Sequence, residues 1–259
     1  MIAILSPAKS ILDLDKTVPC ALECSKPSFL KDSSELIKIL KTKSRKEIGT
    51  LMHVSEAIAD LNFKRYKSWK KTHNETNSRH AVLAFSGPAF IGLDAASFSE
   101  NELLYSQNHL RILSGLYGIL KPLDFFQDYR LEMGTTLENE NGTNLYHFWG
   151  DKLRRSIQKE LNQDDNILVN LASNEYSKAL QLDQLKAKVI TCHFMDQAPS
   201  GDFKVIMAFA KKARGLMSRF IIKNEIKNPE ELLAFDYDGY FYDAKRSTEN
   251  ELYFLRNKV

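Results

Sequence analysis

Short apolar runs alternate with amphipathic stretches along most of this chain, and this alternation strongly limits the folds open to it. The runs MIAIL at the start, NILVN from residue 166 and KVITCHFM from residue 188 are typical of buried strands. Helical spacing is found between them, in residues 33–42, about 45–61, 99–113 and 148–161. Strands that alternate with helices predict a mixed α/β (α+β) fold. Because no linker divides the sequence, we expect one compact domain over residues 1–259.

Weaker patterns add further elements to this prediction. Strands are expected in AVLAF (residues 81–85), YRLEM (129–133) and FKVIMAF (203–209). A short helix is expected in NEYSKAL, directly after the strand that begins near residue 167.

Composition restricts the cellular setting. No run approaches the ~20 apolar residues that a membrane-spanning helix needs, and the first residues lack the pattern of a signal peptide. The three cysteines, Cys20, Cys24 and Cys192, show no CxxC spacing. We therefore expect a cytoplasmic protein with reduced thiols and no membrane partner.

Positive charge is segregated along the sequence, although the net charge is only +3. Residues 36–80 hold 11 Lys and Arg against 4 Asp and Glu, and residues 201–223 hold 6 against 1. Residues 81–150 are acidic, with 3 against 8. This distribution predicts a basic face on a nearly neutral protein.

The most basic helical segment is AFAKKARGLMSRFII, residues 208–222. On a helical wheel its apolar side chains share one face, and the opposite arc carries four cations with Gly215 and Ser218 near its centre. Small residues flanked by cations would let a phosphodiester approach closely. A solvated helix face is the simpler interpretation. The four cations are Lys211, Lys212, Arg214 and Arg219.

The segment LRILSGLYGILKP predicts two short helices joined by a turn that Gly115 and Gly118 bound. Amide groups exposed at the start of the second helix would bind phosphates. The pattern resembles a helix-hairpin-helix element, here residues 106–126, with Arg111 and Lys121 beside it. Two residues separate the glycines where that element usually has one, so a plain turn between helices remains the alternative.

Catalytic candidates are few. Lys9 follows the first strand in SPAK and is suited to contact a phosphate, although the glycines of a P-loop are absent. NLASNEYSK places polar side chains after a strand, where Glu175 is a candidate general base or simply an acidic residue in a helix's first turn. No histidine pair has ligand spacing, so we predict no metal site and no cofactor.

Several of these motifs together resemble the YaaA family of peroxide-stress proteins. The shared segments are LSPAKS, LRILSGLYGILKPLD, YRLEMG, FWGD, NLASNEY and KKARGLMSRFII, and their order extends over residues 1 to about 243. The resemblance implies a cytosolic protein that limits hydrogen peroxide damage and is linked to lower available iron. It also implies a mixed α/β fold with a basic cleft and a DNA-binding helix-hairpin-helix.

Carried onto this sequence, the resemblance implies phosphate-contacting residues in five segments. They are Lys9, Arg111, Ser114, Gly115, Tyr117, Gly118, Lys121, Arg130, Lys178, Lys211, Lys212, Arg214 and Arg219. One segment departs from the family pattern, which usually has Lys, Asp and Tyr where FSGPAFIGL has Ser86, Pro88 and Phe90. If this segment touches a ligand, the contact differs in this member.

The primary hypothesis is therefore a non-enzymatic protein of the peroxide response that binds double-stranded or branched DNA without reading its sequence. The alternative is an enzyme that acts on a phosphorylated small molecule or a nucleic-acid end, with Glu175 as base and Lys9, Lys178 and Arg214 as anion contacts. A small anionic ligand in the cleft fits the alternative. Iron bound directly by scattered carboxylates and histidines is the weakest hypothesis.

Overall fold

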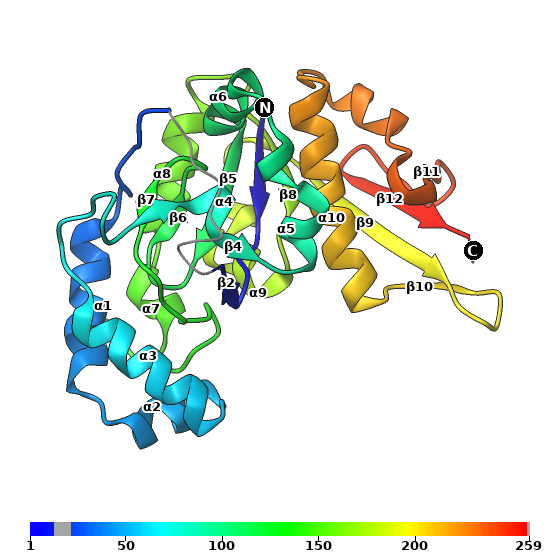
Figure 1. The fold of residues 1–259 in the computed structure, drawn as a ribbon. Coiled ribbons are helices and arrows are strands. Elements are labelled where there is room, and N and C mark those ends of the chain that lie inside the picture. Colours follow the sequence, from blue (N-terminus) through cyan, green and yellow to red (C-terminus); the bar gives the residue numbers. More distant parts are fainter. Residues whose placement is uncertain (13–21, 258–259) are drawn as a thin grey trace.

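The computed structural model describes residues 1–12 and 22–257, and these form a mixed α/β domain around one large sheet (Figure 1). The strand order of the sheet is β11-β12-β9-β8-β1-β5-β6, and β10 pairs with β9. Its strands are β1 (Ile2–Leu5), β5 (Leu110–Ser114), β6 (Gly118–Leu120), β8 (Ile167–Leu171), β9 (Lys188–Gln197), β10 (Phe203–Lys204), β11 (Tyr240–Tyr242) and β12 (Glu251–Arg256). Cys20 lies outside the described residues.

The centre of the sheet is parallel and fully buried. β1 pairs in parallel with β5 on one side and β8 on the other, and β9 continues the parallel order to β12. All four residues of β1 are buried. Such strands need apolar side chains on both faces, which explains why MIAIL and NILVN are continuous apolar runs. The strands predicted there and at KVITCHFM are confirmed.

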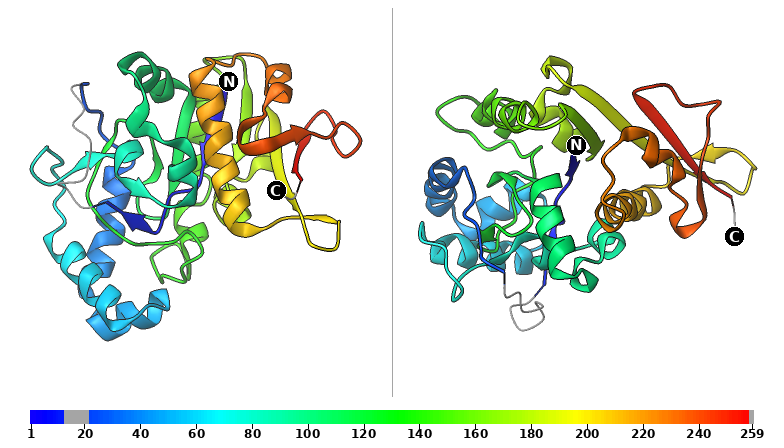
Figure 2. Two further views of the ribbon diagram at one scale, coloured as in Figure 1. Left: turned by 45° about the vertical axis from the view of Figure 1, so that its right-hand side comes forward. Right: turned by 90° about the horizontal axis from the view of Figure 1, so that it is seen from above.

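Helices cover both faces of the sheet, and Figure 2 shows α8 and α10 on opposite sides of it. Two small ladders, β2 (Ser10–Ile11) with β4 (Phe85–Ser86) and β3 (Arg79–His80) with β7 (Phe125–Phe126), flank the sheet. The helices are α1 (Leu30–Thr42), α2 (Arg45–Met52), α3 (Glu56–Ser68), α4 (Ala81–Ala84), α5 (Pro88–Leu93), α6 (Glu100–His109), α7 (Leu145–Trp149), α8 (Lys152–Leu161), α9 (Asn174–Ser177) and α10 (Met207–Lys223). Short 3₁₀ turns are Ala95–Ser97, Lys178–Leu180, Leu182–Gln184, Pro229–Ala234 and Tyr237–Gly239.

The helix-hairpin-helix prediction is wrong. Residues 110–120 form an antiparallel β-hairpin, in which β5 pairs with β6 through Ile112 with Leu120 and Ser114 with Gly118. The tertiary environment explains the difference, because β5 inserts beside β1 and all five of its residues are buried. A strand in that position satisfies its backbone groups in the sheet.

Other element predictions are corrected in their bounds. Residues 81–84 form the short helix α4 rather than a strand, and residues 129–133 have no regular structure. In FKVIMAF the strand stops at Lys204, and α10 begins at Met207. Short apolar runs do not separate strand from helix by pattern alone.

Two helices predicted as continuous are each divided in two. The segment near residues 45–61 breaks because His53 adopts a left-handed conformation, with φ of 51°, and ends α2. The segment 148–161 breaks at Gly150, whose φ is also 51°. Glycine adopts this conformation without a steric penalty.

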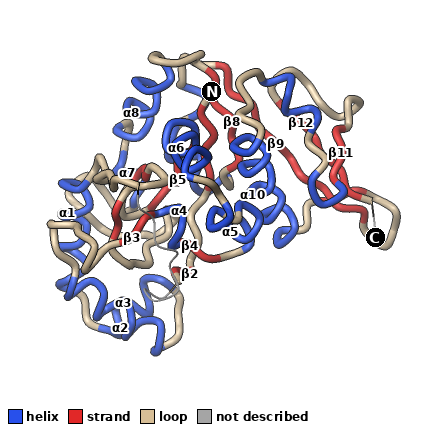
Figure 3. Tube along the Cα trace, turned by 45° about the horizontal axis from the view of Figure 1, so that its top comes forward, coloured by secondary structure: helices blue, strands red, loops and turns tan. Residues whose placement is uncertain are grey.

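Helices α5 and α10 approach each other unusually closely (Figure 3). A Cβ atom placed on Gly215 of α10 would lie 1.7 Å from the carbonyl oxygen of Ala89 in α5. One placed on Gly92 of α5 would lie 2.3 Å from the carbonyl oxygen of Lys212. Gly215 is buried in this contact, and Ser218 is buried as well, with its hydroxyl group donating to the carbonyl of Arg214 at 3.0 Å. The predicted role of these two residues as an exposed landing place for phosphate is therefore wrong.

Candidate ligand-binding cleft

The candidate site lies where the direction of strand addition reverses. From β1 the chain first adds β5 on one side, and later adds β8 on the other. In open parallel sheets, ligands bind in the crevice outside the carboxyl ends of strands at such a switch point. In this chain the loops that leave β1 after Leu5 and β8 after Leu171 border that crevice.

A cavity of about 260 Å³ occupies this position. It is walled by the loop after β1, the loop after β8, β4 with the start of α5, Glu132 and one face of α10. The lining residues are Leu5, Ser6, Pro7, Ala8, Lys9, Ser10, Ser86, Gly87, Pro88, Ala89, Glu132, Leu171, Ser173, Glu175, Tyr176, Lys211 and Arg214. Four of the predicted site residues, Lys9, Glu175, Lys211 and Arg214, are brought together here.

Arg214 is the most distinctive residue of the cavity. It projects from α10, which the glycine contact holds against α5, and its side chain is half-buried. Within residues 1–12 and 22–257, nothing forms a hydrogen bond or ion pair with its guanidinium group. Burial lowers the pKa of Arg214, but an arginine remains charged at neutral pH. In the described residues, the cavity therefore contains a cation without an ion-pair partner.

Lys211 lies one helical turn before Arg214 and is exposed. In the described part of the chain, no carboxylate pairs with it. Lys9 differs, because its Nζ lies 2.5 Å from Oε2 of Glu132. The other oxygen of Glu132 accepts a hydrogen bond of 3.0 Å from Arg130. The positive charge of the cavity is therefore concentrated on α10.

Two hydrogen bonds hold Glu175, one to its side chain and one to its backbone carbonyl. Its Oε1 accepts a hydrogen bond of 2.9 Å from the amide of Gly134, and its carbonyl accepts one of 2.9 Å from the hydroxyl of Tyr146. Its neighbour Tyr176 is buried, and burial raises the pKa of that phenol well above its usual value. Tyr176 is therefore a neutral hydrogen-bonding group at any physiological pH.

Two serines tie the loops of the cleft together. The amide of Ser173 donates to Oγ of Ser6 at 2.9 Å, and the two hydroxyl groups are 3.2 Å apart. Sequence reasoning missed Ser6 as a site residue. Its position directly after the first predicted strand was the available signal.

No group of three or more His, Cys, Asp or Glu side chains in the described residues is arranged to hold a metal ion. Across the same ranges, no helix combines the length and apolar character that crossing a membrane requires.

Comparison with known proteins identifies the family of this chain. Residues 1–246 match the family model described as peroxide stress protein YaaA. The chain belongs to this family. It is also 49% identical to UPF0246 proteins from two strains of Aliivibrio fischeri, MJ11 and ES114, over 259 residues that make up 100% of this chain and 99% of each relative.

The YaaA-family hairpin residues do not reach the cleft surface. Ser114, Gly115, Tyr117 and Gly118 are buried, and Tyr117 accepts a hydrogen bond of 2.9 Å from the indole of Trp69. They were predicted as phosphate contacts on the assumption of an exposed turn between helices. In the hairpin they pack into the core instead.

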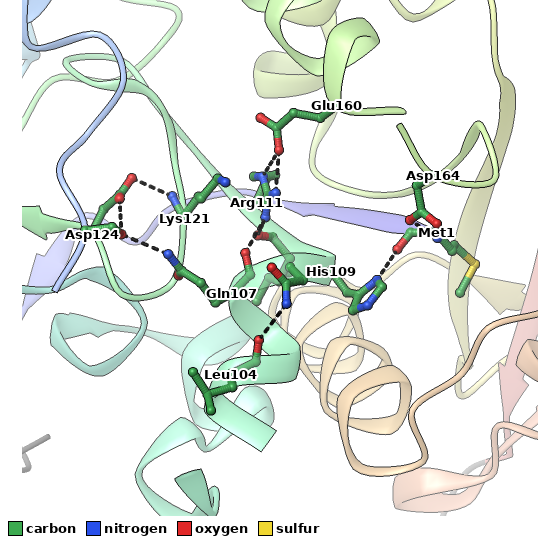
Figure 4. Close-up of polar contacts among 12 residues, drawn as sticks. Met1, Leu104, Gln107, His109, Arg111, Lys121, Asp124, Glu160 and Asp164 are labelled. Atoms are coloured by element: carbon green, nitrogen blue, oxygen red, sulfur yellow. Dashed lines mark hydrogen bonds and ion pairs between the residues drawn. The ribbon is translucent and has the colours of Figure 1, made fainter. Parts of the chain in front are cut away.

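Arg111 is likewise buried, and its polar contacts are shown in Figure 4. Its side chain pairs with Glu160 and donates to the backbone carbonyls of Gln107 at 2.9 Å and Leu110 at 2.6 Å. Its predicted role beside an exposed anion-binding turn is therefore wrong. Lys121, at the far end of the hairpin, is half-buried and does not line the cavity.

Two cations of the predicted basic face have acidic partners from distant segments. Lys212 pairs with Asp238 at 3.1 Å, and Arg219 with Asp94 at 3.3 Å. Lys178 points elsewhere, with its ammonium 5.0 Å from the ring centroid of Tyr146 beside a second, more open cavity. The predicted continuous basic arc is reduced to Lys211 and Arg214 at the cleft.

The segment that departs from the YaaA pattern forms part of the cleft wall. Ser86 and Pro88 line the cavity, whereas Phe90 is buried with its ring 5.2 Å from that of Phe85. Any ligand in the cleft of this member therefore meets a hydroxyl group and a proline ring at this wall.

Proposed function

We propose that this protein serves the peroxide response by binding a phosphate-bearing ligand in the cleft at the ends of β1 and β8. The observation that carries the proposal is Arg214, a half-buried cation that lines the cavity and has no counter-charge in the described ranges. Leaving a charge partly desolvated and unpaired is unfavourable. An anionic ligand that accepts from the guanidinium group removes that cost, and phosphate matches its donor geometry.

Binding of a simple phosphate compound tests this proposal. Ribose 5-phosphate is titrated calorimetrically into the parent, Arg214→Gln and the control Arg155→Gln, which removes an exposed arginine of α8. Charged hydrogen bonds are worth about 1.5–3 kcal/mol, so Arg214→Gln should weaken binding roughly 10- to 100-fold. Arg155→Gln should bind like the parent. Equal affinity in all three proteins would remove Arg214 from the site and reject the proposal.

The same cleft suits an enzymatic form of this proposal. Glu175 is the candidate general base, since Gly134 holds its Oε1 and the residue lines the same cavity as Arg214. Its substrate would be a phosphorylated small molecule or a nucleic-acid end. A turnover that Glu175→Gln abolishes, while ribose 5-phosphate still binds, is the expected result.

DNA binding is the second candidate function, and Lys211, an exposed cation at the cavity with no ion-pair partner in the described residues, favours it. In this form the backbone phosphates of double-stranded or branched DNA enter the cleft, without the helix-hairpin-helix and without base reading. The protein would act in the cytoplasm and limit iron-dependent damage by covering DNA. If peroxide-induced DNA lesions are equally frequent with and without the protein, this role in protection is rejected.

A salt titration separates the two candidates. Each phosphate contact contributes roughly −0.9 to the slope of log K against log salt for duplex DNA. With a labelled duplex of ~30 base pairs, the double variant Lys211→Ala/Arg214→Ala, which removes the two cavity cations without an ion-pair partner in the described residues, should therefore reduce the slope by about two. Lys212→Ala is the control, because its charge is already paired with Asp238. No binding near ~10⁻⁵ M at low salt would leave the small ligand as the function of the cleft.

A further inference from the structure

The cleft is lined by charges of both signs. Arg214 and Lys211 project from α10, and Glu175 lies in α9, which follows β8; all three line the cavity. In the residues that the structure describes, no ion pair and no side-chain hydrogen bond to Glu175 is found apart from the amide of Gly134. Glu175 is half-buried, as is Arg214. The cavity therefore holds an unneutralised anion as well as an unneutralised cation.

These two charges do not pair with each other, although they line one cavity of about 260 Å³. Opposite charges in a partly desolvated site attract strongly, so flexible side chains would be expected to form an ion pair there. Each group has its own support instead. Gly134 holds the carboxylate of Glu175 at 2.9 Å, and the packing of Gly215 against Ala89 fixes the backbone from which Arg214 projects. Both charges therefore line the cavity without neutralising each other.

The rest of the cavity lining is largely apolar. Leu5, Pro7, Pro88, Ala89 and Leu171 contribute aliphatic surface to the cavity, and Tyr176 contributes an aromatic side chain. A ligand that touched only the cations would leave these surfaces uncovered. It would also bring its negative charge toward Glu175. A bare polyanion is therefore a poor match for the whole cavity.

We infer that the ligand of the cleft is amphoteric: its phosphate faces Arg214 and Lys211, an N–H group faces the free oxygen of Glu175, and an apolar or flat body lies between them. The phosphate half of this inference rests on the proposed function. The N–H half rests on Glu175 alone. Nucleoside monophosphates and aminoalkyl phosphates are the chemical classes that carry both groups.

Matched ligand pairs test the N–H half separately. AMP, GMP and CMP are compared with ribose 5-phosphate, and O-phosphoethanolamine is compared with glycerol 3-phosphate, by calorimetric titration at pH 7.5. In the parent, at least one N–H-bearing ligand should bind about 10-fold or more tightly than its partner, the effect expected of one charge-assisted hydrogen bond. The variant Glu175→Gln keeps an amide oxygen for the amide of Gly134 and removes the second acceptor.

In Glu175→Gln the preference for the N–H-bearing ligand should disappear, and ribose 5-phosphate should bind as well as in the parent or better, since a negative charge is gone. Glu138→Gln is the control, because Glu138 is exposed outside the cavity. A parent that binds both members of each pair equally, or a preference that Glu175→Gln leaves intact, would overturn the inference while the proposed function stands. If none of the phosphate compounds binds the parent, the proposed function itself fails.

Discussion

At the residue scale, two glycines in helices of this chain differ in whether their surroundings leave room for a side chain. Gly215 of α10 lies against the backbone of α5, where a Cβ atom would be 1.7 Å from a carbonyl oxygen. Gly49 of α2 has room, since a Cβ atom there would meet the methyl group of Ala59 at 3.5 Å. The first glycine is required by packing, whereas the second only adds flexibility to the unfolded chain.

These two positions predict opposite effects of alanine. Gly215→Ala forces α5 and α10 apart and should lower the free energy of unfolding by about 1–3 kcal/mol, the usual cost of overpacking. Gly49→Ala should raise it by about 0.5–1 kcal/mol, because glycine in a helix is unfavourable relative to alanine. Urea denaturation of both variants measures the difference. A stable Gly215→Ala protein would contradict the observed contact between the helices.

Cys192 illustrates how burial decides the reactivity of a residue. It lies in β9 and is buried, and burial raises the pKa of its thiol to about 12. Since the thiolate is the reactive form, Cys192 should resist both hydrogen peroxide and iodoacetamide in the folded protein at pH 8. The exposed Cys24 should react. Peptide mass spectrometry after brief treatment, with and without urea, measures this, and equal modification of both native thiols would refute it.

At the element scale, the hairpin β5–β6 is where the sequence pattern and the structure disagree most. LRILS follows an amphipathic helix and has no feature that separates it from one more helical turn. Its strand conformation is decided by pairing with β1, which lies more than 100 positions earlier in the chain. By contrast, β1, β8 and β9 could be predicted because their apolar runs are long and continuous. The polar residues after β1 and β8 could then be identified as a site.

The ion pairs of α10 could not be predicted from the sequence. Lys212 pairs with Asp238, which follows α10 in the sequence, and Arg219 pairs with Asp94, which precedes α10. A helical wheel shows which side chains share a face, but not which distant carboxylates meet them. Only Lys211 and Arg214 of the predicted basic arc therefore reach the cleft.

The buried position of Arg111 in β5 predicts that it stabilises the fold. Because its guanidinium group is buried against Glu160 and two carbonyls, Arg111→Ala should destabilise the fold by about 3 kcal/mol. Arg155→Ala, an exposed pair with Asp151, should change stability by less than ~1 kcal/mol. Urea denaturation compares them. A folded Arg111→Ala protein of parental stability that binds phosphate more weakly would restore the role in anion binding.

At the scale of the whole molecule, stability should depend on pH through two histidines. Burial lowers the pKa of His73 and of His80 below the usual value of 6.5. The unfolded chain therefore binds more protons than the folded protein just below that pH. The contribution of these histidines to the free energy of unfolding should consequently be fully present above about pH 6.5. It should be lost as the pH falls from the pKa of the unfolded chain through the lower pKa of the folded protein.

Urea denaturation at pH 7.5, 6.5 and 5.5 measures this loss. His80→Gln should make the pH dependence shallower, because one buried group that must stay neutral is removed. His53→Asn is the control, since His53 is exposed at the end of α2. If His80→Gln and His53→Asn change the pH dependence equally, burial of His80 does not contribute to it.

The central position of β1 has a consequence for synthesis on the ribosome. β1 ends at Leu5, but its neighbours begin only at Leu110 and Ile167. At about 5–20 residues per second, β1, the most apolar strand of the sheet, is synthesised on the order of 10 s or more before its second neighbour. Until then neither the sheet nor the cleft exists, and MIAIL is an exposed hydrophobic segment of a nascent chain. Chaperones that bind such segments during translation should therefore engage this protein early, at its first residues.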